Sequence, residues 1–169
     1  DDESATDALG RRPGAALRGG DVVGLEGPLG AGKTRLVRGI AAGMGIEPAV
    51  VSSPSFVLVQ EYEGPDELVL AHVDAWRLDG PGAVDGLGWD ELAGAPGVVT
   101  VIEWASRIEA AMPPDAAWLE IAPAGADVAG VADLAEIGTS RTIALRAPRK
   151  GVAEAEGLHA RLTAAMAGD

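Results

Sequence analysis

The chain has 169 residues, 47% of them apolar and 23% charged, a balance that indicates one folded globular domain spanning residues 1–169. It contains no cysteine, which excludes disulfides and thiolate metal sites. It has no basic, apolar leader and no apolar run of about 18 residues, so we expect neither a secretory signal nor a membrane span. Its net charge of −13 argues against strong direct binding of nucleic acid, whose phosphates are held by Lys and Arg, and favours a protein partner or a small charged ligand.

The first 44 residues predict a helix, a strand, a glycine-rich loop and a second helix. Residues 3–18 could begin as a helix that Pro13 ends or kinks, because proline lacks the N–H that an inner helical turn needs. A short apolar run bounded by glycines, residues 21–27, indicates a buried strand. Residues 33–44 carry apolar side chains at helical spacing.

The rest of the chain alternates apolar runs with glycine- and proline-rich connections. These runs predict strands at 56–62, 67–76, 98–104, 117–122 and 141–147. Short helices are expected at 82–93 and 105–112, and a terminal helix within the tail, at 152–167. The turn signal EGPD makes the first two strands a hairpin, and the last two suggest an antiparallel flank. The pattern is that of an α/β fold with a mixed parallel and antiparallel sheet.

The glycine-rich loop GPLGAGKT matches the phosphate-binding pattern G-x-x-x-x-G-K-[ST] at Gly27, Gly32, Lys33 and Thr34. Glycines allow the sharp turn that points backbone N–H groups at phosphate oxygens, and the following helix offers its positive N-terminal end. Lys33 is expected to reach the β- and γ-phosphates, and the Thr34 hydroxyl to bind Mg²⁺. The loop therefore predicts a nucleoside triphosphate as ligand.

Two acidic residues end apolar runs, Asp74 in LVLAHVDAW and Glu103 in VVTVIEW. Because ligands of parallel α/β sheets lie at the carboxyl ends of the strands, either acid could hold Mg²⁺ or position the attacking water. An exposed acid at a strand end is the alternative for each.

Three further features near these acids have more than one interpretation. The serine-rich loop at 51–56 could sense the γ-phosphate, as switch loops do, or be a plain polar turn. His72 and Asp74 share one face of a strand, but without another His or Cys nearby a metal pair is the weaker interpretation. Arg77 could contact a phosphate or a partner, or be solvated.

Four motifs in order, GPLGAGKT, SPSFVLVQEY, HVDAWRL and VTVIEW, together resemble the bacterial TsaE family, formerly called YjeE. The resemblance covers roughly residues 3–122, including the opening ESATDALG, and leaves the tail at 148–169 uncovered. It implies a P-loop NTPase-like fold of three layers. The sequence departs from the family's pattern at three positions: at Pro28, where Asp is common, at Arg35, where Thr is common, and at Trp76, where Tyr is usual.

The resemblance also implies an activity. The family is a cytoplasmic P-loop ATPase required for N6-threonylcarbamoyladenosine at adenosine 37 of tRNAs that read codons beginning with A. It acts with a TsaD–TsaB heterodimer and is weak or inactive without these partners.

Carried onto this sequence, the resemblance implies ATP and Mg²⁺ as ligands. The implied nucleotide-binding residues are Gly30, Ala31, Gly32, Lys33, Thr34, Arg35, Ser55 and Trp104, with Thr6 and Arg141 as further contacts. Thr34 and Glu103 are implied to serve the metal, and Asp74, Lys33 and Glu103 the chemistry, with Asp74 as base or water-orienting group.

The sequence leaves other classes of function open. A GTP-driven switch would need an N-K-x-D motif, and the only other lysine, Lys150, lies in RKGV. A small-molecule kinase would need a lid and several arginines around the transferred phosphate; Arg residues at 77, 107 and 141 are available, but no lid-like insertion is evident. A binding module gated by ATP would show the same motifs as the ATPase.

Overall fold

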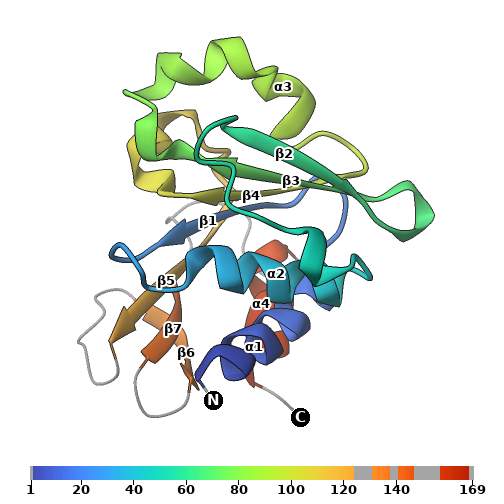
Figure 1. Ribbon diagram of the computed structural model, residues 1–169, viewed down its shortest axis with the longest axis vertical. Coiled ribbons are helices and arrows are strands. Elements are labelled where there is room, and N and C mark those ends of the chain that lie inside the picture. Colours follow the sequence, from blue (N-terminus) through green and yellow to red (C-terminus); the bar gives the residue numbers. More distant parts are fainter. Residues whose placement is uncertain (1, 124–130, 138–140, 147–156, 168–169) are drawn as a thin grey trace.

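The computed structural model describes residues 2–123, 131–137, 141–146 and 157–167 of the chain (Figure 1). The strands are β1 (Val22–Glu26), β2 (Val59–Glu63), β3 (Val69–Asp74), β4 (Val98–Glu103), β5 (Ala117–Pro123), β6 (Val131–Ile137) and β7 (Arg141–Arg146). The α-helices are α1 (Asp2–Ala16), α2 (Lys33–Gly43), α3 (Trp89–Leu92) and α4 (Leu158–Ala167). Short 3-10 helices lie at Pro48–Val50, Pro65–Glu67, Ala75–Arg77, Pro81–Leu87 and Ala105–Ala111.

The described strands form one 7-stranded sheet in the order β2-β3-β4-β1-β5-β7-β6. Strands β3, β4, β1 and β5 are parallel, whereas β2 pairs antiparallel with β3, and β7 pairs antiparallel with both β5 and β6. The expected mixed α/β sheet is therefore confirmed, together with the β2–β3 hairpin and the antiparallel flank. Strand β6 was not expected from the sequence.

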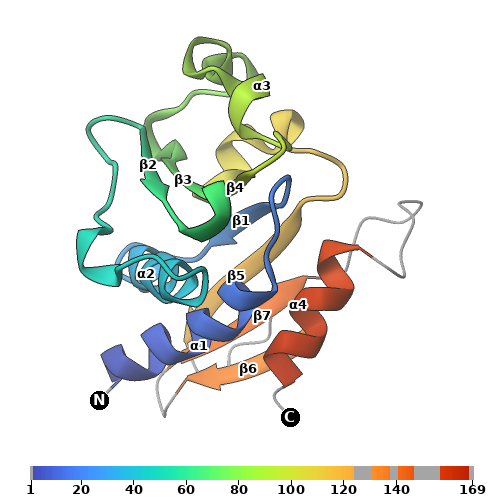
Figure 2. The same cartoon turned by 90° about the vertical axis from the view of Figure 1, so that its right-hand side faces the viewer.

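Helices cover both faces of the sheet, which gives three layers (Figure 2). On one face the apolar side of α2 packs with α4 on β1, β4, β5 and β7. On the other face Val73 and Ile102 of the central strands pack against the 3-10 segments that follow β3 and β4, through Val84, Ala105 and Ile108. Strands β3 and β4 are buried from their second residue on, which explains why their runs are mostly apolar, interrupted by His72 and Thr100 before the final acids.

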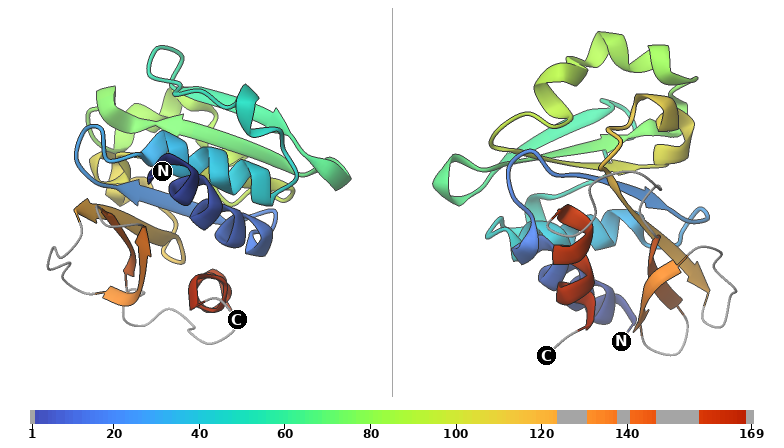
Figure 3. Two further views of the ribbon diagram at one scale, coloured as in Figure 1. Left: turned by 60° about the horizontal axis from the view of Figure 1, so that its bottom comes forward. Right: turned by 180° about the vertical axis from the view of Figure 1, so that it is seen from behind.

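Helix α1 lies along α2 and touches it backbone to backbone (Figure 3). A Cβ atom on Gly14 would lie 2.1 Å from the carbonyl oxygen of Ile40, and one on Gly43 would lie 2.2 Å from that of Arg11. Pro13 was expected to end or kink the first helix, and the first alternative is wrong, because α1 continues to Ala16. Proline forfeits only one bond so near the helix end, and the close contact with α2 outweighs that local cost.

Other boundaries differ from the expected ones for local reasons. Strand β2 begins at Val59 rather than at 56, because Leu58 has a φ of 68° and the N–H groups of Val57 and Leu58 both donate to the Pro54 carbonyl in a turn. The helix expected at 82–93 is a 3-10 segment and α3, separated by Gly88 at a φ of 66°. The helix expected at 105–112 is also of the 3-10 type.

The terminal helix expected at 152–167 corresponds to α4, whereas residues 147–156 lie outside the described part of the chain. Leu158, Leu162 and Met166 are buried at helical spacing. Arg161 fastens the helix to the end of α1 and to the residue before β1: its Nε donates to the Ala16 carbonyl oxygen at 3.1 Å, and its Nη2 donates to both carboxylate oxygens of Asp21 at 2.6 Å. Among the described residues, no helix combines the length and the apolar character needed to cross a bilayer.

Candidate functional site

The glycine-rich loop connects β1 to α2 at the carboxyl end of the sheet's parallel strands. Gly27, Gly30 and Gly32 have φ values of 143°, 76° and 105°, which residues other than glycine rarely adopt. A Cβ atom on Gly27 would lie 2.5 Å from the Ile121 carbonyl oxygen, so this position also needs glycine for space. The glycines therefore make the sharp turn that was expected of them.

Lys33, the first residue of α2, points back into this loop. Its ammonium donates to the carbonyl oxygens of Gly27 at 2.8 Å and Pro28 at 3.0 Å, and its Nζ lies 3.5 Å from the centroid of the Trp104 ring. Burial lowers the pKa of Lys33, although the nearby carboxylates, Glu103 first, act in the opposite direction. The ammonium is thus held where an entering phosphate would replace the carbonyl partners.

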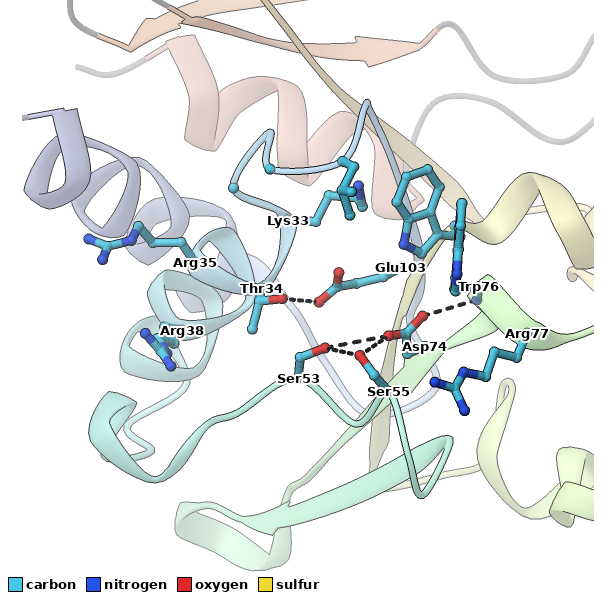
Figure 4. A pocket seen from close by; sticks show the side chains of 14 residues that line it. Lys33, Thr34, Arg35, Arg38, Ser53, Ser55, Asp74, Trp76, Arg77 and Glu103 are labelled. Atoms are coloured by element: carbon cyan, nitrogen blue, oxygen red, sulfur yellow. Dashed lines mark hydrogen bonds between the residues drawn. The ribbon is translucent and has the colours of Figure 1, made fainter.

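The two predicted acids lie side by side at the ends of neighbouring strands, because the parallel register of β3 and β4 pairs Asp74 with Glu103. Both are nearly buried, at 4% exposure each. The Thr34 hydroxyl donates to Oε1 of Glu103 at 2.6 Å and so joins the loop helix to β4 (Figure 4). Mg²⁺ prefers oxygen ligands and is held in nucleotide sites by one or two carboxylates together with substrate phosphates. The Thr34 hydroxyl and the two carboxylates therefore fit this metal.

The serine-rich loop meets Asp74 (Figure 4). Oδ2 of Asp74 accepts hydrogen bonds from the Ser55 hydroxyl at 2.7 Å and the Ser53 hydroxyl at 3.4 Å, while Oδ1 accepts one from the backbone N–H of Trp76 at 3.0 Å. Ser52 instead bonds to Gln60, away from the acids. The loop is therefore tied to the acid expected to act on water.

His72 is a buried neighbour of Glu103 that the sequence reasoning did not include among the site residues. Its Nε2 lies 2.9 Å from Oε1 of Glu103, and its side chain is fully buried. The pairing of His72 with Asp74 in a metal site gains no support, because no group of three or more His, Cys, Asp or Glu side chains in the described residues could hold a metal. The sequence signal that could have placed His72 at the site was its position two residues before Asp74, on the same face of the strand.

Aromatic rings and arginines stack on one another beside the site. Trp104 follows β4 in the left-handed region, with a φ of 60°, which is unusual for so large a residue. Its ring packs on that of Trp76 with centroids 4.6 Å apart, and the Arg107 guanidinium lies 4.9 Å from the centroid of Trp76. Arg77 lies 5.2 Å from the Phe56 ring centroid.

The glycine-rich loop, the two acids, the serine-rich loop and the two tryptophans surround a pocket of about 510 Å³. Of the residues expected from the sequence, it brings together Gly30, Gly32, Lys33, Thr34, Arg35, Ser55, Asp74, Glu103 and Trp104. Ala31 lies on the other side of the loop, in a smaller pocket with Ile121. Thr6 and Arg141 belong to α1 and β7, but their side chains lie outside the described residues, and their roles stay predictions. The pocket is also lined by Ser53 and Arg77, for which a phosphate contact was one of the interpretations, and by Leu29, Arg38 and Trp76, to which the sequence reasoning assigned no role.

Comparison with known proteins agrees with this geometry. Residues 1–128 match the family model described as "Threonylcarbamoyl adenosine biosynthesis protein TsaE". The chain belongs to the TsaE family. The match includes the loop, both acids and β1 to β5, and the antiparallel flank of β6 and β7 and helix α4 lie beyond it.

TsaE relatives and a solved structure support the same assignment. The chain is 38% identical over 122 residues to the tRNA threonylcarbamoyladenosine biosynthesis protein TsaE of Bacillus subtilis, covering 72% of this chain and 74% of that protein. It is 45% identical over 113 residues to the protein of the same name from Mycobacterium leprae, covering 61% and 67% of the two chains. The crystal structure of Bacillus subtilis YdiB superposes with a TM-score of 0.62 at 32% identity, covering 85% of this chain and 78% of the other.

Proposed function

We propose that this chain is a magnesium-dependent ATPase that acts with a TsaD–TsaB heterodimer in forming N6-threonylcarbamoyladenosine at adenosine 37 of tRNAs reading codons that begin with A. The general role, in biosynthesis of this tRNA modification, follows from membership of the TsaE family. The ATPase activity, the metal, the partners and a cytoplasmic location are the finer parts of the proposal.

One observation carries the ATPase part. The Thr34 hydroxyl, directly after the phosphate-loop lysine, bonds to the Glu103 carboxylate at 2.6 Å, and Asp74 lies beside Glu103 on the neighbouring strand. A phosphate loop, a hydroxyl and an acid at a strand end are the parts that P-loop NTPases use to bind a nucleotide with its metal. Asp74 supplies a second acid in the same pocket.

The chemistry assigned to this chain is positioning and charge stabilisation. The loop N–H groups and Lys33 would bind the phosphates, and Thr34 and Glu103 would hold Mg²⁺, which supplies neutralisation of charge on the phosphate oxygens. Asp74 would orient the attacking water or accept its proton, in an orientation set by Ser55 and the Trp76 N–H. The excess of acidic side chains supports a division of labour in which the partners contact the tRNA.

The test is ATP hydrolysis by the purified chain, alone and with the matching TsaD–TsaB pair, for the wild type and for Lys33→Ala, Asp74→Ala and Glu103→Ala. We expect low activity alone, a sharp rise with the partners, and loss of that rise in all three variants. High activity that ignores the partners, or a partner-stimulated rate that survives Lys33→Ala, would refute the proposal.

A small-molecule kinase is the second candidate, favoured by the presence of Arg35, Arg38 and Arg77 in the pocket lining. However, the Arg38 Nε donates to the Val51 carbonyl oxygen at 2.8 Å, and Arg77 stacks on Phe56. Transfer of the γ-phosphate from ATP to a small acceptor, without partner proteins, would support this candidate over the ATPase.

A further inference from the structure

We propose that His72 is a positioning residue that holds the Glu103 carboxylate in the orientation required by the magnesium ion of the bound nucleotide. This inference rests on the proposed function, because it assigns Glu103 to the metal. It adds a residue from β3 to a metal site otherwise built from α2 and β4.

Two donors from different elements fix one oxygen of Glu103. Oε1 accepts the Thr34 hydroxyl at 2.6 Å and lies 2.9 Å from Nε2 of His72. Thr34 approaches from α2, and His72 approaches from β3, whose backbone is locked to β4 by the parallel ladder. A carboxylate held from both sides cannot rotate about its last bond without losing a hydrogen bond.

The surroundings of His72 specify which ring nitrogen carries the hydrogen. An ionised carboxylate has only lone pairs to offer, so Nε2 of His72 must be the N–H that faces it. In the neutral ring Nδ1 then carries a lone pair, and this atom is buried without a hydrogen-bond partner among the described residues. The opposite tautomer would bury an unpaired N–H and place a lone pair against the carboxylate, which is worse on both counts.

The unpaired Nδ1 also argues against a purely structural role. His72 lies between Ala71 and Val73, and all three are fully buried. An aliphatic side chain would fill this place without leaving a polar atom unpaired, so packing alone does not favour histidine. The gain that offsets this cost is the N–H directed at Glu103, a contact of the kind by which outer-shell groups orient metal ligands.

The experiment separates binding of the metal from binding of the nucleotide. Calorimetry measures the affinity for the ATP analogue with an imido β–γ bridge, first in EDTA and then at increasing Mg²⁺, for the wild type, His72→Leu and His72→Gln. We expect His72→Leu to keep the wild-type affinity in EDTA and to require about 10–100-fold more Mg²⁺ for half of the metal effect. His72→Gln, whose amide N–H can reach Glu103, should restore most of the Mg²⁺ affinity.

The matched control is His159→Leu, which changes the only other histidine of the chain. Nε2 of His159 lies 2.9 Å from the Arg146 carbonyl oxygen, far from the acids in the fold, and its loss should leave the Mg²⁺ requirement unchanged. Thermal unfolding without ligand checks that each variant is folded. If His72→Leu does not fold, His72→Asn replaces it, because its shorter amide does not reach Glu103.

An unchanged Mg²⁺ requirement in His72→Leu would overturn the inference. So would an equal loss of affinity in EDTA and in Mg²⁺, which is the result expected of a merely structural residue, or a shift in His159→Leu as large as that in His72→Leu. If the wild type fails to bind the analogue or ignores Mg²⁺, the proposed function itself is wrong, and the inference about His72 falls with it.

Discussion

Replacing Gly14 by Ala sets two physical effects of opposite sign against each other. Gly14 is inside α1, where alanine is better than glycine by about 1 kcal/mol of helix propensity. In the structure, however, the added Cβ would lie 2.1 Å from the oxygen and 2.8 Å from the carbon of the Ile40 carbonyl in α2. Propensity alone predicts stabilisation, and the packing predicts the reverse.

The packing should win. Overpacking of a tight interior costs about 1–3 kcal/mol, and the upper end applies here because the obstacle is helix backbone, which has no rotamer to change. After subtracting the propensity gain, we expect Gly14→Ala to lower the free energy of unfolding by about 2 kcal/mol. For a chain of this size that corresponds to a fall in Tm of roughly 4–8 °C.

Thermal and urea unfolding of the wild type and two alanine variants tests this expectation. The matched control is Gly86→Ala in the 3-10 segment after β3, where a Cβ would meet nothing within 4 Å. There the substitution only restricts the unfolded chain and should be neutral or stabilising by up to about 1 kcal/mol. A Tm for Gly14→Ala at or above that of the wild type would refute the backbone contact between α1 and α2.

Three further predictions address the site and the terminal helix. Asp74→Asn should lower the partner-stimulated rate of ATP hydrolysis by about 100-fold or more with little change in nucleotide affinity. A near-wild-type rate would show that Asp74 does not orient the attacking water or accept its proton. Burial lowers the pKa of Lys33, so between this lowered pKa and 10.5 Lys33 binds more protons in the unfolded chain than in the folded one. The free energy of unfolding of the wild type, relative to that of Lys33→Met, should therefore rise with pH towards 10.5. Urea unfolding at several pH values measures this difference, and a difference that does not change with pH would contradict the prediction. Arg161→Met should lower the free energy of unfolding by about 1–2 kcal/mol through loss of its bonds to Asp21, and an unchanged Tm would show that these bonds do not fasten α4.

The parts of the site that the sequence predicted are those encoded by neighbours along the chain. The loop needs glycines at positive φ directly before a helix, and this requirement is visible in GPLGAGKT. Strands β3 and β4 are buried on both faces, so each is a mostly apolar run, and an acid at the end of such a run stands out as Asp74 and Glu103 do. Recognition of the TsaE family added roles that these local signals alone left open.

Other expectations failed because packing overrode local preference. Pro13 should disfavour the end of α1, yet the glycines at 10 and 14 allow contact with α2, and that contact maintains the helix to Ala16. The spacing of Gly10 and Gly14, repeated by Gly39 and Gly43 in α2, was a signal of close helix packing that the sequence analysis did not use.

The sequence by itself determined the glycine-rich turn, the principal strands and the acids at their ends, because backbone conformation and apolar periodicity depend on residues close together in the chain. Only the tertiary structure decided that β4 lies between β1 and β3, and that this order brings Glu103 to Thr34 and His72. These residues are far apart in sequence, and their meeting depends on strand order, register and packing. Such long-range pairing is a property of the whole fold rather than of any one segment.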